Sequence, residues 1–356
     1  MEKSKNSKEK LIQSIFLQWY RKNKRDLPWR KLQGNQLPNP YYILVSEFML
    51  QQTTVNTVVK RFNEFIHLWP SLKQLSLITE NRILKFWSGL GYYNRARNLL
   101  KTVKIISRDF KSKVPRNYDQ LINLPGVGEY TAKAILGIVY NQHVLPLDAN
   151  IERIIARLYR IKTSLRLNKK KIQDIASHYQ SFNKASDLIQ SFMDYGSAIC
   201  LPRNPKCEKC VVKKFCEARK KNIQHLIPFK KSILEKKKIK FTRAYIIMNH
   251  KNEILVNRRK SKGMLASMLE VPNDEWVDTK KQLIRHDIYN DLSVKHKRIG
   301  KISYSFSHFD LDIGIYKSKV VKKKYKNFNW IKSNKIDASG MPTVMKEIVK
   351  KSINIK

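Results

Sequence analysis

Residues 124–136 read LPGVGEYTAKAIL, in which a proline and two glycines stand directly ahead of an apolar helical stretch. Gly126 and Gly128 let the backbone approach another group closely, and the N–H groups at a helix start favour an anion. Backbone donors of this kind hold phosphates without reading a base sequence. An ordinary turn between helices uses the same glycines, so this stretch alone predicts a helical fold whose turn can face a phosphate.

The chain on both sides of this turn has apolar residues at helical spacing. The helices expected from this spacing cover residues 11–20, 43–66, 81–87, 96–110, 132–140, 151–161 and 172–179. After residue 241 we expect a hairpin around 249–252, two strands within 303–320 around Asp310, and helices at 280–292 and 341–353. The pattern predicts an all-α domain over 1–226, a basic linker over 227–240 and a smaller α/β domain over 241–356.

The charge of the chain is strongly one-sided. Its 356 residues include 72 Lys and Arg against 28 Asp and Glu, a formal net charge of +44. Such a charge repels itself in the folded state, so a polyanionic partner is the natural reason to carry it, although an AT-rich genome also inflates Lys. No stretch has the roughly 20 apolar residues that cross a bilayer, and residues 1–10 lack a signal-peptide core. We therefore expect a soluble, intracellular protein, whose charge suits either nucleic acid or an anionic membrane surface as a partner.

All four cysteines fall in one short run, with the spacing C-x6-C-x2-C-x5-C: Cys200, Cys207, Cys210 and Cys216. Four thiolates gathered in this way can surround one soft metal centre, either iron–sulfur or zinc. Tetrathiolate zinc sites usually show two CxxC pairs, and this run has one. The spacing therefore favours an iron–sulfur cluster over zinc and over free core cysteines.

Two carboxylates stand in contrasting contexts. Glu47 lies inside YYILVSEFML (41–50), and burial raises the pKa of a carboxyl, which suits a proton donor, although a structural pair with Arg30 would look the same. Asp148 precedes ANIERIIARL, where helix N–H groups stabilise its ionised form and an ordinary N-cap is the plain interpretation. We expect the two pKa values to be pushed apart. Cleavage of an N-glycosidic bond needs such an acid and such an anion, because the leaving base takes a proton and the sugar becomes cationic.

Taken together, these motifs resemble the adenine DNA glycosylases (MutY type) of the helix–hairpin–helix superfamily, over residues 11–220. The resemblance includes the hairpin, the cysteine spacing, and the strings LPWR (27–30), SEFMLQQT (46–53) and GLGYY (89–93). It implies that Glu47 is the general acid, that Asp148 is the catalytic carboxylate, and that the cysteines hold one [4Fe–4S] cluster per chain. The family's usual Gly after this Asp is Ala149 here.

The resemblance also implies contacts with an extruded base, since the scissile bond is inaccessible inside a duplex. Arg30 and Gln190 correspond to positions near the extruded adenine, and Gln52 and Tyr92 to residues inserted beside the opposite base. The remaining substrate-binding positions are Tyr130 and Asn150.

Tyr130 separates this chain from the bifunctional relatives. Endonuclease III carries a nucleophilic Lys at the position two after Gly128, and this chain has Tyr130 there. The resemblance therefore implies a monofunctional DNA N-glycosylase that uses water. The alternatives are an endonuclease III-like glycosylase and lyase for oxidised pyrimidines, and a non-catalytic, cluster-bearing DNA-binding protein.

The tail, residues 241–353, resembles the Nudix-like domain of the same family. GMLASMLEVP (263–272) matches its small-residue loop, and Phe306, Ser307 and His308 match the FSH loop that reads 8-oxoguanine. An exposed strand end would have the same residue types. The Glu-rich metal-binding helix of true Nudix hydrolases is missing, so we expect no pyrophosphatase activity.

The reading as a whole predicts a base excision repair enzyme that removes adenine mispaired with 8-oxoguanine or guanine. Its fold would be an all-α helix–hairpin–helix glycosylase domain with a cluster loop, followed by a Nudix-like domain. We expect a monomer in the bacterial cytoplasm, associated with the nucleoid, whose partner is double-stranded DNA and not a membrane.

Overall fold

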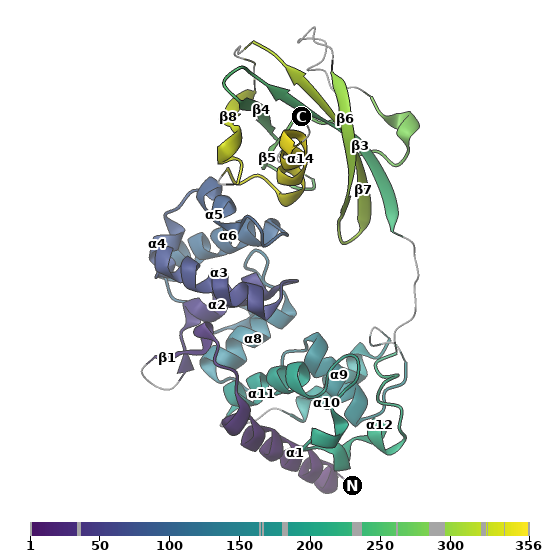
Figure 1. Ribbon diagram of the computed structural model, residues 1–356. Coiled ribbons are helices and arrows are strands. Elements are labelled where there is room, and N and C mark those ends of the chain that lie inside the picture. The colour runs from purple at the N-terminus through teal and green to yellow at the C-terminus, as the bar shows by residue number, and fades with distance from the viewer. Residues whose placement is uncertain are drawn as a thin grey trace. The chain divides into compact units, whose positions relative to one another are not determined.

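The structure is a computed structural model of the chain. It describes residues 2–33, 37–163, 165, 167–179, 184–229, 237–260, 263–284, 296–321, 325, 327–337 and 339–354. The chain packs as two units (Figure 1). The first contains Met1–Leu77 and Asn98–Ile233, and the second contains Ile78–Arg97 and Leu234–Lys356.

The first unit is helical apart from one two-stranded ribbon, β1 (Leu32–Gln33) with β2 (Leu37–Pro38). Its helices are α1 (Glu2–Asn23), α2 (Pro40–Leu50), α3 (Val55–Leu68), α4 (Leu72–Ser76), most of α6 (Asn94–Asp109), α7 (Tyr118–Ile122), α8 (Glu129–Tyr140), α9 (Ala149–Leu158), α10 (Lys169–Ser177), α11 (Ala185–Ala198) and α12 (Glu217–Lys220). Among the described residues, no helix is long and apolar enough to cross a membrane.

The observed helices depart from the expectation in several places, and the short helices α4, α7 and α12 were not expected. The single helix expected over 43–66 is two helices, α2 and α3, because the backbone turns at Gln52, whose φ is +58°. Helix α11 was not expected from the apolar periodicity. Its buried face carries polar residues, which break that pattern: Ser186, Gln190, Ser191 and Asp194.

The hairpin quoted above is formed by α7, the turn after it, and α8. Gly128 is the N-cap of α8, and Asn141 ends the helix in the left-handed conformation with φ 53°. Helix α8 is buried along most of its length and packs against α2 and α11. This packing fixes the beginning of α8, where Tyr130 stands, beside Glu47 on α2.

The second unit is built on a mixed sheet in the order β5-β4-β3-β7-β6, with β8 paired to β4. The strands are β3 (Lys238–Met248), β4 (Glu253–Arg258), β5 (Leu269–Glu270), β6 (Lys297–Ser305), β7 (Phe309–Lys319) and β8 (Phe328–Lys332). The central pair β3 and β7 is parallel, and the other pairs are antiparallel. Helix α14 (Thr343–Asn354) packs its apolar side into the core that these strands form, and α5 (Glu80–Trp87) belongs to the same unit.

Several expectations for the tail can be compared with these strands. The β3–β4 hairpin and the helix near 341–353 are confirmed. The turn expected at Asp310 is wrong by a few residues, because the Phe306 N–H bonds the Phe309 carbonyl and Asp310 pairs with Ser305 inside the ladder. Of the helix expected at 280–292, the described part is a single 3-10 turn, Lys280–Gln282, and residues 285–292 lie outside the described residues. Strand β3 begins at Lys238, inside the segment expected as linker.

Candidate active site and cluster loop

A pocket of about 450 Å³ opens in the first unit between the 3-10 turn η1 (Pro28–Arg30) and helices α2, α8, α9 and α11. The structure brings most of the predicted site residues of this unit to its wall: Arg30, Glu47, Gln52, Tyr130, Asp148, Asn150 and Gln190. Because these residues come from five separate elements, only the tertiary fold gathers them.

Glu47 lies on α2 and is buried. Burial and, to a smaller degree, the charge of the neighbouring Asp148 raise the pKa of its carboxyl, which stands at about 7. A hydrogen bond from the Tyr130 hydroxyl and the charge of Arg30 act in the opposite direction. A carboxyl with this pKa is protonated in about half of the molecules near neutral pH, so it can donate a proton there.

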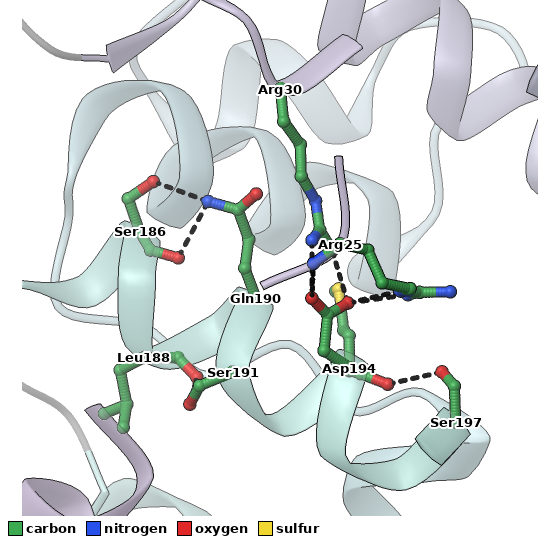
Figure 2. Close-up of polar contacts among 9 residues, drawn as sticks. Arg25, Arg30, Ser186, Leu188, Gln190, Ser191, Asp194 and Ser197 are labelled. Carbon is green, nitrogen blue, oxygen red and sulfur yellow. Dashed lines mark hydrogen bonds and ion pairs between the residues drawn. The ribbon is translucent and has the colours of Figure 1, made fainter. Parts of the chain in front are cut away.

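Arg30 does not form the structural pair with Glu47 that the sequence left open. Its guanidinium donates two hydrogen bonds to the carboxylate of Asp194 on α11, with N···O distances of 2.8 and 2.9 Å. Arg25 donates to the same carboxylate through Nε at 2.7 Å (Figure 2). These bonds and charges hold the pKa of the buried Asp194 below its ordinary value, although burial opposes them. Sequence reasoning missed Asp194 and Arg25, and the only signal was an Asp inside an apolar stretch.

Asp148 is the N-cap of α9, as expected. Its Oδ1 accepts from the backbone N–H of Asn150 at 2.9 Å and of Ile151 at 2.7 Å, and its Oδ2 accepts from the Asn150 side chain at 2.9 Å. These donors favour the ionised form, but burial outweighs them and raises the pKa of Asp148. The N–H groups thus favour the ionised form of Asp148 as expected, but they do not lower its pKa below the ordinary value, because both carboxyls are desolvated in one pocket.

Asn150 and Arg153 connect Asp148 to the cysteine loop. The Arg153 guanidinium donates to Asn150 Oδ1 at 2.8 Å, to the Gly196 carbonyl at 2.8 Å and to the Cys200 carbonyl at 2.8 Å. Gly196 is required at this contact, since a Cβ there would lie 2.5 Å from Asn150 Cβ. Ala149 stands exposed at the first position of α9, where a helix accepts alanine readily.

The four cysteines form no disulfide with one another and line one small cavity: Cys200, Cys207, Cys210 and Cys216. Arg157, buried on α9, donates to Cys200 Sγ at 3.2 Å and to the Leu201 carbonyl at 2.7 Å. Four thiolates around one shared space have the donor set of a metal–sulfur centre.

The GVG turn, predicted to contact a phosphate, leads directly into α8. Gly126 has φ +78°, and a Cβ there would lie 2.7 Å from Asn98 Cβ, so this position requires glycine. Gly128 is exposed and caps α8 without a side-chain hydrogen bond. The first N–H groups of α8 are thus left facing outward at the positive end of the helix dipole.

Gln52 and Tyr92, expected to enter the base stack, share an uncommon backbone conformation. Gln52 has φ 58° and Tyr92 has φ 47°, although neither is glycine. Both side chains are exposed, Tyr92 by 42%. Non-glycine residues held in this region cluster at functional sites. Tyr92 does not line the pocket.

The FSH residues form the turn between β6 and β7. Ser307 and His308 are exposed, and the Ser307 hydroxyl is hydrogen-bonded to the Tyr92 hydroxyl, which belongs to the same unit. Phe306 is partly buried, with its ring 5.0 Å from that of Phe309 and 5.4 Å from that of Trp276. Of the three, Phe306 anchors the turn and the other two present polar groups to the outside.

Three family models match the chain. Residues 45–180 match the HhH-GPD superfamily of base excision DNA repair proteins, residues 200–216 match the iron–sulfur binding domain of endonuclease III, and residues 243–351 match the NUDIX domain. The second match falls on the four cysteines, which agrees with the sulfur arrangement above. The loop holds a [4Fe–4S] cluster.

The chain is also similar to curated proteins along most of its length. It is 34% identical to the adenine DNA glycosylase of Buchnera aphidicola subsp. Schizaphis graminum, over 85% of this chain and 86% of that protein. The human adenine DNA glycosylase is 27% identical over 85% of this chain and 65% of that protein. A thymine/uracil-DNA glycosylase of Methanothermobacter thermautotrophicus is 31% identical, but over 61% of this chain.

Among solved structures, a thermostable thymine-DNA glycosylase has a TM-score of 0.55 and 31% identity, covering 61% of this chain and 99% of that one. A trapped endonuclease III–DNA covalent intermediate has a TM-score of 0.50 at 20% identity, covering 61% of this chain and 98% of that one. The second likeness shows the fold alone. The similarity that extends over both units is to the adenine enzymes.

Proposed function

Because the chain belongs to the adenine DNA glycosylase family, we propose that it excises adenine paired with 8-oxoguanine or with guanine in double-stranded DNA. The enzyme is a monofunctional DNA N-glycosylase of base excision repair. The observation that carries the proposal is the pairing, in one pocket, of a carboxyl with a pKa of about 7 and a second, hydrogen-bonded carboxylate.

In the proposed reaction, the flipped adenine enters the pocket and Glu47 protonates it. The bond between C1′ and the base nitrogen breaks, and its electron pair leaves with the base, which the proton from Glu47 neutralises. The Asp148 carboxylate stabilises the cationic sugar, and its bonds from Asn150 and Ile151 favour the anion that this role needs. Water adds to C1′ and returns a proton to the Glu47 carboxylate.

Tyr130 supports hydrolysis over strand cleavage. It occupies the position where the lyases hold lysine, and its hydroxyl is committed to a hydrogen bond with Glu47. Burial and the two carboxylates raise its pKa well above its ordinary value, so it stays a neutral donor. A neutral phenol cannot form a Schiff base with the sugar.

The remaining assignments follow from exposure and charge. The open N–H groups at the start of α8 would hold a DNA phosphate, while Gln52 and Tyr92 would enter the stack beside the opposite base. Ser307 and His308 would read that base from the β6–β7 turn. We propose that residues 1–226 perform the excision, that 241–356 recognise 8-oxoguanine, and that the enzyme acts as a monomer.

The test is a single-turnover assay on three duplexes, which carry adenine opposite 8-oxoguanine, adenine opposite guanine, or thymine glycol. We expect release of adenine from the first two, with an intact strand until alkali is added. Preferential release of thymine glycol would contradict the proposed substrate. Borohydride trapping that keeps pace with base release would show that another lysine acts as a nucleophile.

A further inference from the structure

The amide of Gln190 has a fixed orientation at the wall of the pocket. Its side chain is 4% exposed, and its Nε2 donates to the Ser186 carbonyl and to the Ser186 hydroxyl, both at 3.2 Å (Figure 2). Both N–H groups of the amide are therefore used within helix α11. The amide oxygen points away from Ser186, to the side on which Arg30 lies (Figure 2).

The partners of Ser186 determine this orientation. Its hydroxyl donates to the Ile138 carbonyl at 2.8 Å, so toward Gln190 the hydroxyl can only accept. The Ser186 carbonyl is also an acceptor. If the amide were reversed, Oε1 would face two acceptors at once, so the assignment follows from the bonding network. The Ser186 backbone N–H bonds the Asn141 side chain at 3.0 Å, which holds this first turn of α11 against the end of α8.

The result is a buried acceptor whose partner has to come from a ligand. Gln190 Oε1 has almost no contact with water and no hydrogen-bond partner among the residues that the structure describes. A buried acceptor without a partner is costly, and a ligand donor removes that cost. The exocyclic amine of adenine is such a donor, whereas the 6-oxo group of hypoxanthine is a second acceptor.

We propose that Ser186 is a positioning residue that makes Gln190 an acceptor only, so that the pocket selects a flipped base with an exocyclic amino group. This selection rests on the proposed glycosylase function and assigns part of its base specificity to one helical turn. Such a pocket binds a 6-oxo purine poorly, because the 6-oxo group and Gln190 Oε1 are both acceptors and would face each other in a desolvated site.

The first test asks whether Gln190 interacts with the exocyclic amine of adenine. Single-turnover release of adenine and of unsubstituted purine, each opposite 8-oxoguanine, is measured for the wild type and for Gln190→Met. Dividing the two adenine-to-purine ratios cancels the intrinsic reactivity of each base. We expect the ratio to fall roughly tenfold in Gln190→Met, the size of one hydrogen bond. An unchanged ratio would overturn the proposal.

The second test separates positioning from mere support of the fold. Ser186→Ala removes one of the two acceptors that hold the amide, so a rotated amide can donate to a 6-oxo group. We expect the adenine-to-hypoxanthine ratio to narrow by about threefold or more. The matched control is Ser191→Ala on the same helix. Ser191 is also buried, and its hydroxyl donates to the Leu188 carbonyl at 2.6 Å and not to the Gln190 amide (Figure 2).

The outcomes are distinct. If both serine variants lose activity on every base equally, Ser186 supports the fold and does not position Gln190. If Ser186→Ala alone changes the ratio, the proposal stands. Failure of the wild type to release adenine at all would overturn the proposed function, while adenine release with unchanged ratios would overturn only this inference.

Discussion

The pocket of the helical unit and the β6–β7 turn of the strand-rich unit present their polar groups in opposite ways. Glu47 and Gln190 are buried, and neighbouring side chains fix each of them. Ser307 and His308 are exposed at a turn, where the Ser307 hydroxyl is hydrogen-bonded to the exposed Tyr92 hydroxyl. Both regions are proposed to contact a DNA base, but only the pocket holds its polar groups buried in fixed orientations.

The difference follows from what each region has to do. Moving a carboxyl pKa to about 7 requires desolvation, and desolvated polar groups need fixed partners. Reading the edge of a base in a duplex requires groups that reach out of the protein. Changes in the pocket should therefore be large and affect chemistry, while changes in the turn should be small and affect preference.

The largest effect is expected from Glu47→Gln, which keeps the shape of the side chain and removes the proton donor. Adenine release in a single turnover should fall by roughly 10²- to 10⁴-fold, while duplex binding stays nearly unchanged. Glu9→Gln is the matched control, since Glu9 is also a buried carboxylate that accepts from a tyrosine hydroxyl, that of Tyr159 at 2.5 Å, outside the pocket. Turnover of Glu47→Gln at the wild-type rate would remove Glu47 from the mechanism.

Gly196→Ala should reduce the same rate on the order of 10²-fold without touching a reacting group. The new Cβ would lie 2.5 Å from Asn150 Cβ and displace the amide that bonds Asp148, and a misplacement of about 1 Å can cost that much. Gly314→Ala in β7 is the comparison, because its nearest contact is an ordinary 3.4 Å. Equal rates for the two variants, with equal unfolding temperatures, would show that Asn150 does not position Asp148.

The pH dependence of adenine release should report the titration of Glu47. Because protonated Glu47 is the active form and burial raises its pKa to about 7, adenine release should be fastest below pH 7. It should fall about tenfold for each pH unit well above that value, as the protonated fraction falls. A single-turnover profile from pH 5 to 9 measures this, and the fall should be missing in Glu47→Gln. A profile that rises through pH 7 would reverse the assigned role.

The smallest effect is expected from the double variant Ser307→Ala and His308→Ala. Guanine and 8-oxoguanine differ at N7 and C8, and each lost hydrogen bond is worth about 0.5–1.5 kcal/mol, roughly two- to tenfold. The preference for adenine opposite 8-oxoguanine should shrink by that amount, with little change opposite guanine. If the full preference survives in the competition of the two duplexes, recognition rests on Gln52 and Tyr92.

The sequence predicted the helical fold, the cluster loop and the strand pairs of the tail more accurately than the details of the site. The resemblance to the family predicted that Glu47 and Asp148 share one site, and the structure places both carboxyls in one pocket. It did not predict Asp194 or Ser186, since helix α11 buries polar residues and so hides its own periodicity. Nor could it predict that Asp148 would be desolvated, because the lining of its pocket comes from distant elements.

By itself, then, the sequence determined what local spacing controls: four thiolates within one loop, two glycines ahead of α8, and the alternation along β7. Only the tertiary structure decided which group pairs with which. Arg30 forms an ion pair with Asp194, while Glu47 is hydrogen-bonded to Tyr130. Ser186 accepts hydrogen bonds from the amide nitrogen of Gln190. The physical reason is that a pKa or an amide orientation depends on burial and on the nearest partner, which are set by packing between residues far apart in the chain.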